Sequence, residues 1–194
     1  MGSFSPSRTS ILGANEIEGR GPAASNRAGA GTVSTLNGLR PIIRIVTLNN
    51  VITTTIQVAL KGLKNKNDID DVIGLAGVSQ ARLCKVTSAE MGQIFKISMS
   101  CTELPTASSN VGLDIDLRSA ASLVRSYDFD LSSGTSLIAA GGNWALGKTI
   151  EQLVTVPTAN HALYLTTGNT HTGDSVYTAG QLVITLHGHK LLTA

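Results

Sequence analysis

Residues Ala159–Gly168 read ANHALYLTTG, and residues Tyr177–Gly188 read YTAGQLVITLHG. In both stretches large apolar side chains alternate with smaller or polar ones, and a loop rich in Gly, Asn and Thr separates the two. Alternation with a period of two, bounded by turn residues, predicts half-buried β-strands. These two stretches decide the fold class, because the same pattern recurs along most of the chain.

The recurring pattern predicts about eight to ten short strands separated by turn signals. Its high content of β-branched residues disfavours helix, because these side chains lose χ1 freedom there. Short strands without a long helix predict an all-β, antiparallel β-sandwich, and a jelly roll is the favoured form. The further predicted strands are residues 42–46, 51–60, 82–87, 92–101, 111–118, 136–140 and 149–156.

Side-chain direction follows from the same alternation. Residues 61–71 read KGLKNKNDIDD, and this charged stretch is predicted to be an exposed loop. In the strand at residues 92–101, alternate side chains are predicted to point into the core. The inward residues of this strand are Phe95, Ile97, Met99 and Cys101.

The composition fits this fold class. Apolar residues make up 42% of the chain, which is enough for a hydrophobic core, whereas charged residues make up only 14%. Ordinary soluble domains carry about 25% charged residues. A surface poor in charge is typical of β-rich proteins and of surfaces that become buried in assemblies. Aromatic residues are only 4% of the chain, which disfavours a base-stacking or sugar-binding surface.

Residues 1–38 are predicted to form an N-terminal arm, and residues 39–194 the sandwich domain. The arm is rich in Gly, Ser, Ala, Asn and Arg, so it cannot bury enough apolar surface to offset the entropy lost on ordering. Two interpretations stay open: a disordered tail, or an extended arm that orders on a neighbouring subunit. In the second case its anchors would be the apolar residues Ile11, Leu12 and Ile17.

The charge of the arm bears on its partners. Residues 1–44 hold five arginines and two glutamates. This is far from the blocks of Lys and Arg that are typical of an RNA-packaging tail, so nucleic acid is not predicted as a partner. The chain has no apolar run of 18 residues, so no transmembrane helix is predicted.

Residues Gly142–Thr149 read GNWALGKT and match the phosphate-loop pattern G-x-x-x-x-G-K-[ST]. A phosphate loop works only between a strand and a helix, where backbone amides and the lysine hold the phosphates. The residues that follow are β-branched and end at Pro157, which is poor helix sequence. The favoured interpretation is therefore a turn whose Trp144 fills the core.

Metal binding has two weak candidates. His187 and His189 are two residues apart on a predicted strand and so share one face, but a metal site needs a third ligand, such as His161 or His171. Residues 65–71 carry several Asn and Asp side chains, the oxygen donors that calcium prefers, without the spacing of an EF-hand. Polar edge residues and a solvated loop are the favoured interpretations, so no metal site and no cofactor are predicted.

The sequence shows no recognisable arrangement of catalytic residues, so the chain is not predicted to be an enzyme. The carboxylate pairs Asp114/Asp116 and Asp128/Asp130 would suit a glycosidase only in a groove with aromatic floors. The nucleophile elbow G-x-S-x-G is missing from the sequence. Cys84 and Cys101 are the two cysteines, and the sequence leaves open whether they form a disulfide.

The C-terminal stretch also resembles a known kind of protein. LYLTTG at residues 163–168, a polar turn, YTAG at 177–180 and LVITLHG at 182–188 are similar to a module in small structural proteins of tailed bacteriophages, notably marine and cyanobacterial ones. Those proteins are β-sandwiches that decorate or cement capsids, or that form knobs and fibres. The long polar arm departs from their simplest versions. The resemblance implies no catalytic residue.

Architecture and resemblance together predict a virion structural protein: a capsid decoration, cement or small capsid protein located in the virion. Its partners would be copies of itself and a major capsid protein or another virion component, and its arm would order on a neighbouring subunit. The alternative is a receptor- or glycan-binding module of a tail fibre or knob, with Trp144, Tyr164 and Tyr177 as its ligand face. A remoter alternative is an NTP-binding protein through Gly142–Thr149.

Overall fold

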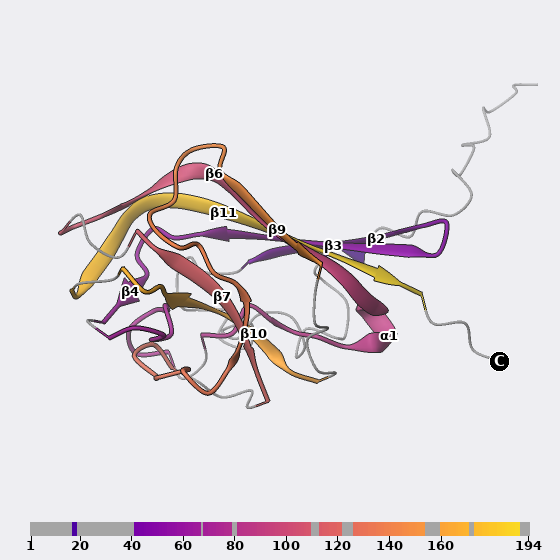
Figure 1. Cartoon of the computed structure of the whole chain (residues 1–194), viewed down its shortest axis with the longest axis horizontal. Coiled ribbons are helices and arrows are strands. Elements are labelled where there is room, and N and C mark those ends of the chain that lie inside the picture. Colours follow the sequence, from indigo (N-terminus) through magenta and orange to yellow (C-terminus); the bar gives the residue numbers. More distant parts are fainter. Residues whose placement is uncertain are drawn as a thin grey trace, which may run out of the picture.

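The computed structural model describes residues 17–18, 41–66, 68–78, 81–109, 113–121, 126–153, 160–170 and 173–190. In this part of the chain the strands form two antiparallel sheets that pack face to face (Figure 1). The single helix there, α1 (Ser88–Met91), has four residues, and no described helix is long and apolar enough to cross a membrane. The predicted all-β sandwich is confirmed.

Each sheet has a defined strand order. The larger sheet runs β1-β2-β3-β11-β6-β9, with β4 paired to β11, and the smaller runs β5-β10-β7-β8. The strands of the larger sheet are β1 (Ile17–Glu18), β2 (Ile42–Leu48), β3 (Val51–Ala59), β4 (Lys64–Asn65), β6 (Gln93–Ala107), β9 (Thr149–Leu153) and β11 (Ser175–His189). Those of the smaller sheet are β5 (Cys84–Lys85), β7 (Ile115–Ala120), β8 (Thr135–Ile138) and β10 (Ala162–Thr167).

The pairing of these strands is that of a jelly roll. Eight of them follow one another along the chain as β3, β5, β6, β7, β8, β9, β10 and β11. The first pairs with the last, β3 with β11, and the pairing then continues inward as β5 with β10, β6 with β9 and β7 with β8. A chain folded as a double ribbon and wrapped into two sheets has this order, which confirms the jelly roll.

The larger sheet carries an extra strand at its edge. Strand β2 joins β3 through a two-residue turn at Asn49 and Asn50, whose φ angles are 48° and 64°. Asparagine tolerates this left-handed conformation, and two such residues make the turn that matches the twist of a hairpin. The hairpin projects past the smaller sheet (Figure 1).

The core lies between the sheets, and a second apolar cluster lies outside the smaller one. Along β3 every second side chain is buried, as its alternation predicts. Strand β10 differs, because all six of its residues are buried. Its outward Tyr164 packs with Val72 and Leu131 from two covering segments, so that both faces of β10 exclude water.

Two local predictions are wrong. Phe95 does not join the inward row, because a register shift between β6 and β11 adds a residue there, and the half-buried ring stacks on His189 with centroids 4.4 Å apart. The stretch at residues 61–71 is only partly an exposed loop. Its Leu63 and Asn65 are buried, because β4 pairs with the start of β11 and draws this stretch against the sheet. Its Asp71 is buried where it forms an isolated bridge with Asp130.

Candidate functional site

The phosphate-loop sequence Gly142–Thr149 begins in the connection after β8 and ends at the first residue of β9, and its Trp144 packs into the core. Trp144 is 2% exposed, and its Nε1 donates a hydrogen bond to the carbonyl of Ile115 at 2.8 Å. The Nζ of Lys148 donates to the carbonyl of Ala140 at 2.9 Å and lies 5.3 Å from the Trp144 ring centroid. The interpretation of this loop as a turn whose tryptophan fills the core is confirmed.

The three aromatic residues considered as a ligand face all lie in the interior. Trp144, Tyr164 and Tyr177 are 2%, 0% and 1% exposed. Trp144 and Tyr177 belong to the main core, and Tyr164 to the second cluster. Burial raises the pKa of the Tyr177 hydroxyl, which fits its place inside the sandwich. None of the three therefore presents a ring to a ligand at the surface.

The two histidines near the end of β11 share one face, as the spacing predicts. His187 Nδ1 lies 3.4 Å from Thr53 Oγ1, and both His187 and His189 contact the ring of Phe95. Within the described ranges, no group of three or more His, Cys, Asp and Glu side chains is placed to hold a metal ion. His171 lies outside these ranges, as does Asn67 of the stretch considered for calcium.

Asp114 and Asp116 are buried and tie loops to β7. Asp114 accepts hydrogen bonds from the backbone and hydroxyl of Thr170 at 3.0 and 2.9 Å, and from the amide of Gly142 at 3.2 Å. Asp116 accepts a bond of 2.7 Å from the amide of Ala140. Burial raises the pKa of Asp116 to about 6. The pair therefore holds the loop before β9 and the loop after β10 against the smaller sheet.

Asp71 forms a buried acidic site that the sequence did not predict. Its side chain is 3% exposed, and its Oδ2 has no hydrogen-bond partner in the described part of the chain. Burial raises its pKa to about 6, and the negative charges of Asp68, Asp128 and Asp130 add to the shift. The acidic residues in this stretch of the sequence predicted a charged surface loop. In the structure Asp71 is instead covered, where it forms an isolated bridge with Asp130.

The two cysteines belong to different sheets, Cys84 to β5 and Cys101 to β6. Both are buried and free, which resolves the open question of a disulfide. Burial raises the pKa of Cys84 to about 12 and also raises that of Cys101. A thiol that stays protonated is a poor nucleophile, so both act as small apolar core residues.

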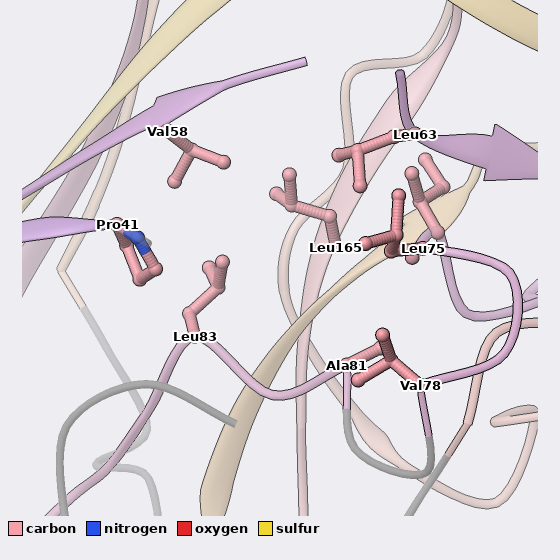
Figure 2. A pocket seen from close by; sticks show the side chains of 10 residues that line it. Pro41, Val58, Leu63, Leu75, Val78, Ala81, Leu83 and Leu165 are labelled. Atoms are coloured by element: carbon pink, nitrogen blue, oxygen red, sulfur yellow. The ribbon is translucent and has the colours of Figure 1, made fainter. Parts of the chain in front are cut away.

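An apolar pocket of about 40 Å³ opens between the sheets (Figure 2). Val58 of β3 and Leu165 of β10 face it from the two layers, and Leu75, Val78 and Leu83 line it from the connection to β5. Cavities that admit a benzene ring have about 150 Å³. The pocket therefore has room for a group the size of a side chain.

The outer face and edges of the larger sheet are the surface best suited to a partner. Ile42 and Leu48 of the edge strand β2 are 67% and 55% exposed, and Leu153 of the opposite edge strand β9 is 84% exposed. Between the edges lie half-buried residues such as Thr55 and Thr185. Large apolar side chains thus stand at both edges of a sheet face that carries few charges.

Comparison of the chain with protein-family models, with curated proteins and with solved structures finds no match. The function is therefore inferred from the jelly roll and from the surfaces described above.

Proposed function

We propose that this chain is a virion structural protein, of the capsid decoration, cement or small capsid kind. It assembles with copies of itself and binds a lattice formed by a major capsid protein or another virion component. The arm at residues 1–38 orders on a neighbouring subunit. The observation that carries the proposal is a jelly roll whose larger sheet exposes large apolar side chains at both edges.

The fold supports this function without deciding it. Jelly rolls occur in viral capsid and lectin domains and in cupins, so the choice depends on the surface. A sugar-binding face needs aromatic platforms, and the three aromatic candidates are buried. Exposed Ile42, Leu48 and Leu153 instead favour contact with another protein, because an interface would remove these large apolar side chains from water.

The composition supports assembly in a second way. Burying charged groups at an interface costs desolvation energy that ion pairing often fails to recover. The chain has only 14% charged residues, and on the outer face of the larger sheet Lys96 pairs with Glu151 at 2.9 Å. Contacts that are weak singly gain avidity when they repeat over a lattice.

The test replaces exposed apolar side chains at the two sheet edges. The double variant Ile42→Thr/Leu153→Thr keeps β propensity and removes apolar surface, so it should fold normally and assemble less. Leu104→Thr is the matched control, since Leu104 is a 45% exposed leucine on β6. Light scattering over a range of protein concentrations measures the assembly, and circular dichroism checks the fold.

Loss of oligomers in the double variant, with the control unchanged, is the expected result. An oligomer distribution that is the same for the wild type and the double variant would show that these edges are not the assembly surface.

A further inference from the structure

The edge strand β2 is fully paired on one side and mostly open on the other. One backbone edge of β2 pairs with β3 along its whole length, from Ile42 opposite Gln57 to Leu48 opposite Val51. At the other backbone edge of β2, in the part of the chain that the structure describes, only the two residues of β1 pair with it. Ile17 stands opposite Ile45, and Glu18 opposite Arg44.

This edge lacks the features that usually prevent strand addition. Natural edge strands are protected by lysines, prolines, bulges or short length. Strand β2 has seven residues, its register with β3 is continuous, and Arg44 is its one charged residue. It also exposes Ile42 and Leu48. A regular and partly apolar edge is a template for a further antiparallel strand.

The link between β1 and β2 is long enough to reach another copy. Residues 19–41 separate the two strands. At about 3.3–3.6 Å per extended residue, such a link spans up to roughly 75–80 Å. A domain of this size has a radius of gyration of only about 15 Å. The pairing within one chain can therefore also be made between neighbours.

We infer that β2 is the acceptor, and β1 the donor, in a strand exchange between copies of this chain. Within the chain Glu18 stands opposite Arg44, so that the register places an acidic residue across from a basic one. The exchange would place Glu18 of one copy at this same register on the next. The inference rests on the proposed self-assembly and names the edge and the register through which the arm acts. The partner is a second copy of this chain.

Paired cysteines test the exchange. A Glu18→Cys chain is mixed with an ¹⁵N-labelled Arg44→Cys chain, oxidised under native conditions, and the linked peptides are identified by mass spectrometry. Residues opposite each other in an antiparallel pair have Cα atoms about 4.5–5.5 Å apart, which suits a disulfide. Cys84 and Cys101 do not compete, because both are buried.

The matched control mixes Glu18→Cys with Ile42→Cys. Ile42 is exposed on the same side of β2 and lies two residues, about 6.6 Å, out of register. The 18–44 disulfide between labelled and unlabelled chains is expected to exceed the 18–42 disulfide several-fold. A double variant with both cysteines in one chain reports pairing within the chain.

Failure of the exchange can be told apart from failure of the proposed function. Oligomers seen by light scattering without an interchain 18–44 disulfide would overturn the exchange and leave the proposed assembly standing. Absence of both oligomers and the interchain disulfide would overturn both. A disulfide that forms only within the double variant would show that the arm pairs with its own domain, which also overturns the exchange.

Discussion

At the scale of single residues, Trp144 links the loop before β9 to the interior. The tryptophan is the only one in the chain, and its Nε1 donates to the Ile115 carbonyl at 2.8 Å. Trp144→Phe should keep most of the packing and leave that carbonyl without its donor. A buried group left unpaired costs about 1–3 kcal/mol, so the free energy of unfolding in urea should fall by that amount.

The control for Trp144→Phe is Leu146→Ala in the same loop. Leu146 is 68% exposed, so its loss should change the free energy of unfolding by about 0.5 kcal/mol or less. Equal losses in the two variants would contradict the role assigned to Trp144.

Asp71 should make the stability of the chain depend on pH. Its pKa in the folded protein is about 6, against an ordinary value of 3.8, because burial and nearby carboxylates disfavour its charged form. The stability gained from the protonated form is therefore fully present below pH 3.8 and is lost as the pH rises through 6. The raised pKa of Asp116 likewise makes the protein less stable as the pH rises.

Asp71→Asn keeps the shape of the side chain and removes its charge. At pH 8 the variant should be more stable to urea than the wild type by about 1–3 kcal/mol, since each pKa unit corresponds to 1.36 kcal/mol. The difference in the free energy of unfolding between the variant and the wild type should become smaller as the pH falls towards 4. Asp174→Asn is the control, because that side chain is 62% exposed. Parallel pH profiles for the wild type and Asp71→Asn would contradict this account of Asp71.

Some of this residue-level picture follows from sequence and some does not. The position of Trp144 in the core was predicted, because a large apolar side chain in a short turn is most favourably buried. The burial of Asp71 was not predicted, because it depends on residues 128–131, which are distant in the chain and cover it through the bridge to Asp130. Local alternation carries no information about such covering segments.

At the scale of elements, β6 and β11 are two strands of 15 residues that bend together over the smaller sheet (Figure 1). Their register shifts several times between Tyr177 and Leu182. Gly180 lies in this bend with φ of 125°, and a Cβ added there would lie 2.7 Å from the Cα of Pro105. Glycine is needed at this position both for its backbone angle and for the close approach of β6.

Gly180→Ala should therefore destabilise the fold by more than a glycine substitution in open space. Gly62→Ala is the matched control, because Gly62 has φ of 88° and nothing within 4 Å of an added Cβ. Gly62→Ala should lower the free energy of unfolding by about 1 kcal/mol from backbone strain alone. Gly180→Ala should lower it by about 2–4 kcal/mol. Thermal or urea unfolding measures both. A loss no larger than that of the control would mean that the bend tolerates a side chain.

The strands themselves were largely predictable, but the bulge at Phe95 was not. A Cβ on Gly188 would lie 2.0 Å from the carbonyl oxygen of Met91, so the end of α1 passes directly against β11 at this point. The register shift of β6 occurs beside this contact and turns Phe95 to the outer face. A contact between distant segments thus overrides the local alternation that predicted an inward Phe95.

At the scale of the whole molecule, the fold class could be predicted because short alternating strands leave few other architectures. The assignment of strands to sheets could not. The two C-terminal stretches follow each other in sequence, yet β10 lies in the smaller sheet and β11 in the larger. That separation arises because the jelly roll pairs strands from opposite ends of the chain, and periodicity does not encode such long-range pairing.

The central claim is that this jelly roll assembles with copies of itself through its arm and sheet edges. The most direct test is light scattering after size exclusion on the full chain and on a chain that begins at Leu39, with circular dichroism to check that both are folded. We expect the full chain to form a discrete oligomer and the shortened chain to be a folded monomer. Equal assembly of the two, or monomers in both cases, would contradict the claim.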